Sequence, residues 1–467
     1  NNTQSYGLVK FIVTPYTRKA HNDEEKCSGV NDTVYVWVEP TVHVNLSTKQ
    51  DTICNKGAID VTLTSDDTPT RDIRFKYVVE APVGITVAPS SDSNLAENTT
   101  LTNVITNNTQ SYGLVKFIVT PYTRKAHNDE EKCSGVNDTV YVWVEPTVHV
   151  NLSTKQDTIC NKGAIDVTLT SDDTPTRDIR FRYVVESPAG ITVSPSSDSN
   201  LAENTTLTNV ITNNTQSYGL VKFIVTPYTR KAHNDEEKCS GVSDTVYIWV
   251  EPTVHVILTP KQDTICNNET IDISLTTNDT PTREARFRYT TELPVGVTVL
   301  PASGSNLSPG AKLSNVITNN NTSAQLVKII VTPYTRKPHN DEEKCTGVQD
   351  TVYIWVEPTV HVTLSVKRDT VCNGDAVEIQ LTTADSPVRE ARFRYVVLTP
   401  SGVTVTPPSG NNLAPGSTLK NIITNNNSSA QLVRFVITPY TRRPGMILKN
   451  ARVLTIQLMY GWNLRCM

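Results

Sequence analysis

The stretch that decides the fold runs from Tyr16 to Val44 and reads YTRKAHNDEEKCSGVNDTVYVWVEPTVHV. Nearly the same letters begin again at Tyr122, Tyr228 and Tyr334, so the sequence repeats with a period of 106 residues (122 − 16). Each copy holds a cysteine in an acidic loop, a run that alternates Val with Tyr and Trp, and a Glu-Pro pair before the next run. We interpret the stretch as the junction between consecutive domains, because a fixed period is typical of repeat architectures.

A unit of this length is the size of one domain and is much longer than the unit of a solenoid. We therefore expect tandem domains whose short Glu-Pro linkers hold successive domains at a nearly fixed angle, as an elongated rod. The expected segments are the end of a truncated repeat (1–40), repeat 1 (41–146), repeat 2 (147–252), repeat 3 (253–358), an incomplete repeat 4 (359–444) and a tail (445–467).

Composition and charge narrow the class of protein. The 467 residues carry a net charge of −4 and an isoelectric point near 6.1, which favours neither nucleic acid nor an anionic membrane surface as a partner. No apolar run approaches the length of a transmembrane helix, so no direct membrane span is expected in this sequence. The chain opens at Asn1 in mid-repeat without a signal peptide, so export signals and anchors are expected outside it.

Alternation of apolar and polar residues between turn signals predicts seven strands in repeat 1 and no helix. They are strand A at 41–47, B at 58–64, C at 74–80, D at 85–88, E at 101–106, F at 114–122 and G at 139–144. The residues expected to face the core are Phe75, Tyr77 and Val79 of strand C, Val115, Phe117 and Val119 of strand F, and Val140, Val142 and Val144 of strand G. We expect strand F to leave its ladder at Pro121. The pattern predicts an all-β, Ig-like sandwich in each repeat.

The order of short motifs resembles the PKD-like repeats of giant Bacteroidota cell-surface adhesins, including gliding-motility adhesins exported by type IX secretion. The matching motifs are Thr-Ile-Cys-Asn (52–55), Leu-Thr-Asn (101–103), Val-Thr-Pro (119–121), Cys-Ser-Gly (133–135) and Val-Glu-Pro (144–146). In the last motif the family usually has Val-Asn-Pro, and Asn55 and Lys56 stand before Gly57 where the family has Gly or Pro-Gly directly after the cysteine. The resemblance extends to Pro444 and implies a secreted, adhesive or stalk-forming protein without catalysis.

Two cysteines recur in each repeat, and in an exported chain they predict disulfides. The candidates are Cys27, Cys133, Cys239 and Cys345 in the F-G loops and Cys54, Cys160, Cys266 and Cys372 in the A-B loops. A metal site is the less favoured alternative, since no Cys-x-x-Cys spacing occurs.

Two pairings of these cysteines remain open. Alternating strands place the A-B and F-G loops of one sandwich at opposite poles, roughly 25 Å apart, whereas bridged Cα atoms lie within about 7 Å. A pairing inside one repeat therefore requires the long loops to fold back. We prefer pairing between neighbours, Cys54 with Cys239 and Cys160 with Cys345.

The tripeptide Asp-Thr-Val or Asp-Thr-Ile occurs twice per repeat and resembles the O-glycosylation signal of Bacteroidota. The candidate acceptors are Thr33, Thr52, Thr139, Thr158, Thr245, Thr264, Thr351 and Thr370. The alternative is that Asp caps a turn and Thr-Val begins a strand. Asn-x-Ser/Thr sequons, for example at Asn98 and Asn107, are attributed to composition.

No cofactor is expected. Acidic loops such as Asp129-Glu130-Glu131 suggest structural Ca²⁺ at a junction, but the spacing matches no EF-hand or RTX pattern and a solvated loop is favoured. Histidines such as His43 and His21 recur singly, so structural or surface roles are expected for them. Packing is likewise favoured over sugar stacking for the recurring Tyr-Trp pairs such as Tyr141 and Trp143.

The tail GMILKNARVLTIQLMYGWNLRCM follows none of the repeat patterns. Shifting the reading frame of permitted codons by one nucleotide can give NDIEKCTGVDDTVNVWVEPTVH, which is the junction motif. We therefore interpret 445–467, including Cys466, as a frameshifted tail without function of its own.

Three classes of function follow from these observations. The first is a stalk or filament of an extracellular, cell-surface adhesin, stabilised by disulfides and O-glycosylated. The second is a repeat-based module that binds glycans or proteins, and the third is a non-catalytic spacer of a secreted enzyme. Host or environmental surfaces, glycans and neighbouring copies of the chain are the expected partners, and no enzymatic activity is expected.

Overall fold

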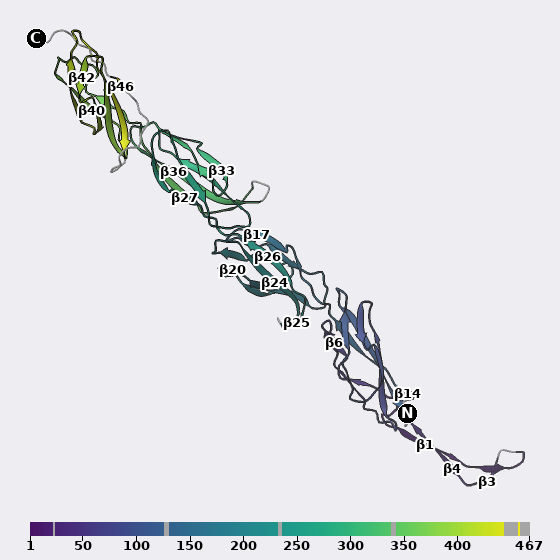
Figure 1. Ribbon diagram of the computed structural model, residues 1–467. Helices are drawn as coiled ribbons and strands as arrows, with labels where there is room; N and C mark the ends of the chain where they lie inside the picture. Colours follow the sequence, from purple (N-terminus) through teal and green to yellow (C-terminus); the bar gives the residue numbers. More distant parts are fainter. Residues whose placement is uncertain (22–23, 126–129, 232–235, 338–341, 443–455, 458–467) are drawn as a thin grey trace. The chain divides into compact units, whose positions relative to one another are not determined.

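The chain is an all-β series of tandem Ig-like sandwiches in the computed structural model (Figure 1). The structure describes residues 1–21, 24–125, 130–231, 236–337, 342–442 and 456–457. Contacts divide the chain into two compact units, one of 1–159, 163–211 and 220–249 and the other of 160–162, 212–219 and 250–467. Within the described ranges no helix has the length and hydrophobicity needed to cross a bilayer.

Repeat 1 consists of a six-stranded sheet, β10-β8-β13-β15-β6 with β14 added to β13, and two smaller sheets, β11-β7-β5 and β12-β9. The strands are β5 (Asn45–Leu46), β6 (Gln50–Ile53), β7 (Val61–Thr64), β8 (Ile73–Glu80), β9 (Ile85–Ala88), β10 (Ser91–Leu95), β11 (Thr100–Leu101), β12 (Val104–Asn107), β13 (Gly113–Arg124), β14 (Glu131–Ser134) and β15 (Asp138–Val144). One apolar cluster fills the space between these sheets, and it extends from Val44 to Val144.

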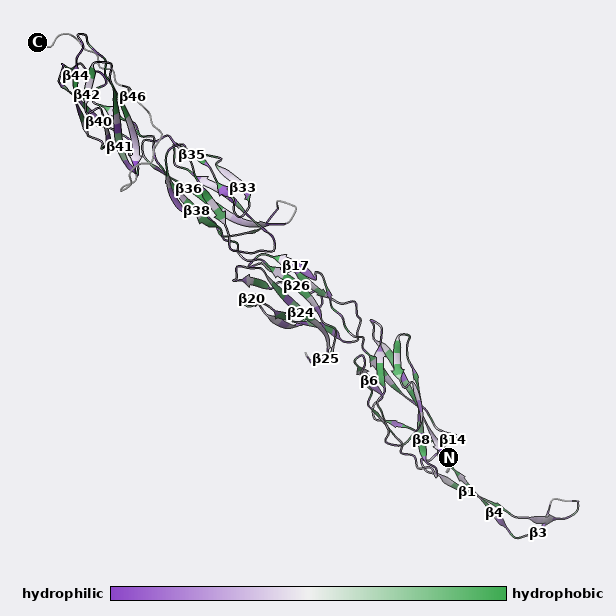
Figure 2. Cartoon of the chain, viewed as in Figure 1, coloured by the Kyte–Doolittle hydropathy of each residue, from purple (hydrophilic) through white to green (hydrophobic). Residues whose placement is uncertain are grey.

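The F and G strands, β13 and β15, carry the largest part of this core. They pair antiparallel without a break from Gly113 opposite Val144 to Val119 opposite Asp138. Alternate residues point to the same face of a strand, and the inward set is fully buried as predicted: Val115, Phe117, Val119, Val140, Val142 and Val144 are each 0% exposed. Figure 2 shows hydrophobic and hydrophilic colours that change along the strands of the chain.

Predictions for strands C, D, F and G hold to within two residues, but strand A was wrong. The described A strand is only Asn45–Leu46. The expected A-B loop contains a further strand, β6, which pairs in parallel with β15 from Gln50 opposite Tyr141 to Ile53 opposite Val144. The predicted E strand is likewise divided into β11 and β12, which belong to different sheets.

The prediction that strand F leaves its ladder at Pro121 holds on the G side and is wrong on the C side. Pairing with β15 ends at Val119, whereas pairing with β8 continues with Pro121 opposite Phe75. The carbonyl oxygen of Pro121 accepts a hydrogen bond of 2.8 Å from the N–H of Gly135. The N–H and C=O of one residue in an antiparallel strand point to the same side. The proline nitrogen therefore faces the space between β15 and β14, where no ladder bond is lost.

A buried amide explains the Leu-Thr-Asn motif. Asn103 is 4% exposed, and its Nδ2 donates to the Tyr77 hydroxyl at 2.6 Å and to the Pro89 carbonyl at 2.7 Å. Burial raises the pKa of Tyr77. The hydrogen bond from Asn103 lowers this pKa, and the negative charge of Asp92 raises it further. The amide thus ties the C strand to the turn after strand D inside the core.

The same architecture recurs in repeats 2 and 3, except that β29 adds a third strand to one of the smaller sheets of repeat 3. The strands of repeat 2 are β16 (Asn151–Leu152), β17 (Gln156–Ile159), β18 (Val167–Thr170), β19 (Asp178–Glu186), β20 (Ile191–Ser194), β21 (Ser197–Leu201), β22 (Thr206–Leu207), β23 (Val210–Asn213), β24 (Gly219–Arg230), β25 (Glu237–Ser240) and β26 (Asp244–Val250). Those of repeat 3 are β27 (Ile257–Thr259), β28 (Gln262–Ile265), β29 (Glu269–Thr270), β30 (Ile273–Thr276), β31 (Glu284–Glu292), β32 (Val297–Leu300), β33 (Ser303–Leu307), β34 (Lys312–Leu313), β35 (Val316–Asn319), β36 (Gln325–Arg336), β37 (Glu343–Thr346) and β38 (Asp350–Val356).

Repeat 4 has its own core but no full G strand among its described residues. Its strands are β39 (Thr363–Leu364), β40 (Ala376–Thr382), β41 (Glu390–Leu398), β42 (Val403–Thr406), β43 (Ser409–Leu413), β44 (Thr418–Asn425) and β45 (Arg434–Arg442). On its G side the F strand β45 pairs with β46 (Ile456–Gln457), at Val436 and Ile437.

The truncated repeat is a pair of two-stranded ribbons, and it contains β1 (Gly7–Val13), β2 (Tyr16–Arg18), β3 (Glu25–Ser28) and β4 (Asp32–Val38). β1 and β4 keep the F-G register. Phe11 is nevertheless 55% exposed, whereas the equivalent Phe117 is 0% exposed. The ribbon therefore has the strands of a repeat without the sheet that buries them.

The glycine of the recurring Cys-Ser-Gly motif gives a first testable prediction. A Cβ added to Gly241 would lie 2.1 Å from the backbone oxygen of Val148. We expect Gly241→Ala to destabilise repeat 2 by about 1–3 kcal/mol through overpacking, measured as faster amide hydrogen exchange in β24 and β26. Ser240→Ala, at the exposed neighbouring position, is the control, and equal exchange in both variants would contradict the steric role.

Candidate functional site

The site with the most specific chemistry is the joint between successive repeats. At the joint between repeats 1 and 2, Glu145 directly follows β15 and is 0% exposed. Its Oε2 accepts the backbone N–H of Thr176 at 2.8 Å, and its Oε1 accepts the Thr176 hydroxyl. A buried carboxylate is costly unless it is paired and hydrogen-bonded, so the B-C turn of repeat 2 stabilises the end of repeat 1.

Arg177 completes this joint from the same turn. Its Nη1 lies 3.7 Å from Glu145 Oε1 and 3.7 Å from the sulfur of Cys239. Its Nη2 donates to the Thr52 carbonyl of β6 at 3.1 Å. One guanidinium therefore contacts the G-strand end, the A-B region and the F-G loop, which a planar group with several fixed donors can do.

Disulfides fasten neighbouring repeats at these joints. Cys54 is bonded to Cys239, and Cys160 is bonded to Cys345. In both bridges the Cα atoms are 5.5 Å apart and the sequence separation is 185 residues. The bonds join the A-B region of one repeat to the F-G loop of the next, in agreement with the pairing preferred from the sequence.

Polar contacts between neighbouring loops complete the joint. Thr174 Oγ1 donates to Ser111 Oγ at 2.7 Å, and the backbone N–H of Thr174 donates to the Gln110 carbonyl at 2.7 Å. Asn55 Nδ2 donates to Thr147 Oγ1 at 2.7 Å. The joint is thus a continuous polar interface with a covalent bond at one side.

The joint between repeats 3 and 4 has the same parts but a free thiol. Glu357 accepts the backbone N–H groups of Val388 and Arg389 at 2.9 Å each. Arg389 Nη1 lies 3.5 Å from the sulfur of Cys266, which is a free cysteine. Burial raises the pKa of this thiol, and Glu269 raises it further while Arg389 opposes the shift.

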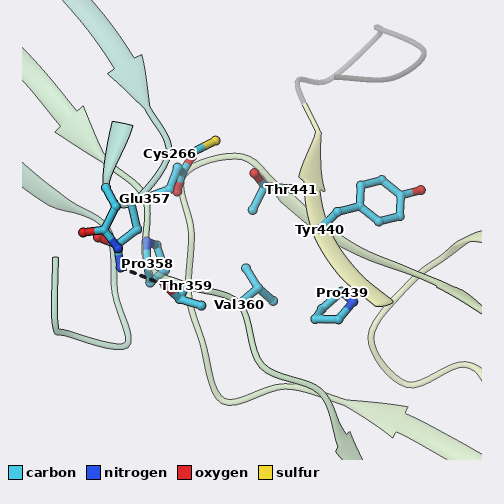
Figure 3. Close-up of a pocket in the computed structure, with 10 residues that line it drawn as sticks. Cys266, Glu357, Pro358, Thr359, Val360, Pro439, Tyr440 and Thr441 are labelled. Atoms are coloured by element: carbon cyan, nitrogen blue, oxygen red, sulfur yellow. Dashed lines mark hydrogen bonds between the residues drawn. The ribbon is translucent and has the colours of Figure 1, made fainter. Parts of the chain in front are cut away.

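A cavity of about 50 Å³ lies beside this thiol. Figure 3 shows Cys266 and Glu357 from repeat 3 across it from Tyr440 and Thr441 of β45. At the preceding joint, Thr335 pairs with Cys345, and Cys345 is bonded to Cys160. Thr441 is equivalent to Thr335, and Cys266 is equivalent to Cys160, since each lies 106 positions later. The cavity therefore lies at the position that Cys345 occupies in the joint between repeats 2 and 3.

The remaining cysteine candidates include free thiols and one further disulfide-bonded residue. Cys27 and Cys133 are free, and Cys372 is disulfide-bonded. Cys466 lies outside the described residues. The position 185 residues after Cys266 is Ala451, so Cys266 has no cysteine at the spacing of the observed bridges.

The Asp-Thr candidates share one local geometry. In each tripeptide the Asp side chain accepts the backbone N–H of the following Thr at 2.7–2.8 Å, and the eight acceptors are Thr33, Thr52, Thr139, Thr158, Thr245, Thr264, Thr351 and Thr370. This contact is the capping interaction expected without a glycan. Thr370 is exposed and the other seven Thr residues are half-buried, so glycosylation stays a prediction.

The other candidate residues have structural contacts. His43 donates its backbone N–H to the buried Asp67 at 2.6 Å, and its Nδ1 lies 3.2 Å from the same oxygen. Asn107 is 2% exposed, and its Nδ2 donates to the Val144 carbonyl at 3.0 Å. In the described part of the chain no group of three or more His, Cys, Asp or Glu could hold a metal, and Asp129 of the suggested calcium loop is not described.

Sequence reasoning missed the buried Glu of the Glu-Pro pair and the Arg of the B-C turn. Both residues recur every 106 positions. The glutamates are Glu145, Glu251 and Glu357, and the corresponding arginines are Arg177, Arg283 and Arg389. That recurrence was visible in the sequence. The contact was not, because it joins residues from two different repeats.

No family model matches the sequence, and none of the curated proteins compared with it matches. Among solved structures, the D1–D4 ectodomain fragment of ICAM-5 is 10% identical with a TM-score of 0.28 and covers 91% of this chain and 99% of its own. The FN1–FN3 domains of chicken CNTN1 are 11% identical with a TM-score of 0.22 and cover 67% and 98%. The D00–D0 domain of intimin is 11% identical with a TM-score of 0.24 and covers 44% and 98%. Scores this low add nothing to the fold shown by the strand pairing.

Removing the buried carboxylate of a joint gives the second prediction. Glu251 accepts the N–H groups of Thr282 and Arg283 at 2.8 and 3.1 Å, so Glu251→Ala leaves both donors without this acceptor. We expect the joint to lose about 2 kcal/mol, measured as about 30-fold faster hydrogen exchange at these two amides. Glu292→Ala, which removes an exposed ion pair with Lys328, should change the exchange little. Equal effects of the two variants would contradict the role of burial.

The thiol of Cys266 gives the third prediction. Because its pKa is raised, its thiolate fraction at pH 8 is below that of a cysteine in a short peptide. We expect iodoacetamide to label Cys266 more slowly than such a peptide at pH 8, and the labelling rate to keep rising above pH 9. Glu269→Gln removes a nearby negative charge and should shift the profile to lower pH. If the labelling rate of Cys266 depends on pH identically in the unaltered chain and in Glu269→Gln, Glu269 does not influence the thiol.

Proposed function

We propose that this chain is a repetitive stalk or filament region of an extracellular, cell-surface adhesin, and that its joints resist mechanical load. The arrangement of the two disulfides carries the proposal. The two disulfides overlap along the sequence. Cys160 lies within the loop that the Cys54–Cys239 bridge closes, and Cys239 lies within the loop that the Cys160–Cys345 bridge closes. A chain that is pulled at its ends cannot extend past its shortest covalent path.

That path is short when both bridges are intact. It crosses from Cys54 to Cys239, returns to Cys160 through 79 residues (239 − 160), and crosses to Cys345. Without the bridges the same end points are separated by 291 residues (345 − 54). At roughly 3.5 Å per extended residue the maximum spans are about 280 Å and about 1,020 Å. The bridges thus limit how far repeats 1–3 lengthen under tension.

Three further points support an exported surface protein. Disulfides persist in oxidising compartments outside the cytosol. The chain repeats one sandwich fold, which fits a structural role. The motif order resembles PKD-like repeats of Bacteroidota adhesins, for which type IX secretion, gliding motility and O-glycosylation at the Asp-Thr sites are part of this proposal.

Pulling single molecules tests the mechanical role. With the bridges intact, we expect complete unfolding between Cys54 and Cys345 to extend that segment to about 280 Å, and reduction to add roughly 740 Å. Cys54→Ser with Cys160→Ser should behave like the reduced chain without reductant. Cys133→Ser, which removes a free thiol, should match the unaltered chain. An equal extension before and after reduction would exclude a load-limiting role.

A repeat-based module that binds glycans or proteins is the second candidate, and one observation favours it. Tyr141, Tyr247 and Tyr353 occupy the same outward position of the G strand and are 36–40% exposed. Exposed aromatic rings stack on sugars and on protein partners. The test is to measure binding to glycans or surfaces with chains of increasing repeat number. A steep rise in binding with repeat number would support this function, because linked modules gain avidity. No binding at any repeat number would contradict it.

A further inference from the structure

We infer that small thiols open the joint disulfides at Cys54 and Cys160, here called the A-B cysteines. The sulfurs released are those of their F-G partners, Cys239 and Cys345. The ligand class is a low-molecular-weight thiol such as glutathione, which ends as a mixed disulfide on the A-B cysteine. The inference goes beyond the stalk function, because it concerns which sulfur of a bridge reacts and not how far the bridges let the chain extend.

The first observation is that the two cysteines of each bridge differ in burial. Cys239 and Cys345 are 6% and 8% exposed. Their partners Cys54 and Cys160 are half-buried. Exchange depends on access to the sulfur that is attacked, so a thiol that approaches from solvent reaches the A-B cysteine more readily.

The second observation is a carbonyl oxygen beside each A-B sulfur. Cys54 Sγ lies 3.4 Å from the carbonyl oxygen of Lys238, and Cys160 Sγ lies 3.3 Å from that of Lys344. The negative end of the carbonyl dipole disfavours a thiolate at this position, as any nearby negative charge does. The A-B sulfur is therefore the poorer leaving group of the pair.

The third observation is a guanidinium beside each F-G sulfur. Arg177 Nη1 lies 3.7 Å from Cys239 Sγ, and Arg283 Nη1 lies 3.5 Å from Cys345 Sγ. Burial alone opposes a thiolate, but a cation next to the sulfur stabilises it. The F-G sulfur is therefore the better leaving group in both joints.

The buried glutamate holds the guanidinium in this position. Glu145 Oε1 lies 3.7 Å from Arg177 Nη1, and Arg177 Nη2 donates to the Thr52 carbonyl at 3.1 Å. The carboxylate shares the positive charge with the sulfur, but its two oxygens also accept hydrogen bonds from Thr176. Arg177 is thus in place before the bridge opens, and it need not move when negative charge develops on Cys239.

The joint between repeats 3 and 4 shows the same arginine position against a sulfur without a disulfide. Arg389 Nη1 lies 3.5 Å from the free thiol of Cys266. Burial raises the pKa of this thiol and Glu269 raises it further, but Arg389 lowers it. The arginine of a joint therefore favours the thiolate form of the sulfur that it contacts.

The covalent step is a thiol-disulfide exchange. The thiolate of the small thiol attacks Cys54 Sγ, the bond from Cys54 to Cys239 breaks, and its electron pair leaves on Cys239 as a thiolate. The small thiol is oxidised to a mixed disulfide with Cys54, and Cys239 is reduced. The Cys239 thiolate then stays beside Arg177 or takes a proton from water. The same step at Cys160 releases Cys345.

The polar contacts of the joint make this step reversible. Glu145 and Thr176 join repeats 1 and 2 without using either sulfur. Cys239 therefore stays close to Cys54 after the bridge opens, and groups held together react much faster than groups free in solution. When the small thiol is removed, the Cys239 thiolate attacks Cys54 Sγ, expels the small thiol and restores the bridge.

Locating the adduct in the full chain tests the inference. The chain is incubated with reduced and oxidised glutathione, and exchange is stopped with acid, because only the thiolate reacts. Peptide mapping then gives the adduct on each cysteine. We expect about tenfold more glutathione on Cys54 and Cys160 than on their F-G partners, and removal of free glutathione should restore the original pairing.

Three results of this experiment would overturn the inference. They are equal amounts of adduct on both sides of the bridges, an excess on Cys239 and Cys345, and no adduct on any of the four bridged cysteines while the exposed thiol of Cys27 is modified.

Two variants separate the charge of the arginine from its packing. Arg177→Lys keeps a positive charge beside Cys239, whereas Arg177→Gln removes it. The preference for Cys54 over Cys239 should be retained with Lys and should fall about threefold or more with Gln. The preference for Cys160 over Cys345 in the same molecules is the internal control and should stay unchanged. Equal preferences at the first bridge in both variants would overturn the role of the charge.

Single cysteines test the difference between the sulfurs without a bridge. Cys54→Ser leaves the Cys239 thiol beside Arg177, and Cys239→Ser leaves the Cys54 thiol beside the Lys238 carbonyl. The rate of iodoacetamide labelling should reach its plateau at a lower pH for Cys239 than for Cys54, and the same plateau pH would overturn the assignment of the leaving group. The pulling experiment depends only on which cysteines are bridged, so failure here leaves the mechanical proposal separately testable.

Discussion

The pairing of the F strand with the G strand is the interaction on which the rest of this structure depends. Its unbroken ladder fixes which face of each strand is inward, and so it buries Phe117 and the valines opposite it. The same ladder sets where β15 ends, and the next residue is the buried Glu145. The core of one repeat and its attachment to the next therefore depend on a single register.

The joint combines contacts of different chemical strength. A buried carboxylate that accepts backbone N–H groups is specific but fails if one partner is removed, whereas a disulfide holds regardless of local opening. Arg177 connects the two, because it lies within 4 Å of both Glu145 and Cys239. Loosening the polar contacts would therefore leave neighbouring repeats tethered, which is the behaviour expected of a load-bearing array.

The two incomplete parts of the chain show what a repeat needs. The ribbon of β1 and β4 keeps its register while its apolar residues stay exposed. Repeat 4 keeps a buried core, including Phe393 and Phe435 at 0% exposed, with only two described residues opposite β45 on its G side. Register is thus set locally by the two strands, whereas burial requires the opposing sheets.

The sequence by itself determined the period, strands C, D, F and G, and the inward residues of the F and G strands. These are local properties, since alternation along one strand reports which face is buried. It also favoured disulfides between neighbouring repeats, because the A-B and F-G loops lie too far apart within one sandwich. Only the tertiary structure decided that Gln50–Ile53 forms a strand parallel to β15, that Pro121 lies where no N–H is needed, and that Asn103 and Glu145 are buried with their partners. Each of these depends on a segment distant in sequence, and a local pattern carries no information about which distant group supplies the hydrogen bond.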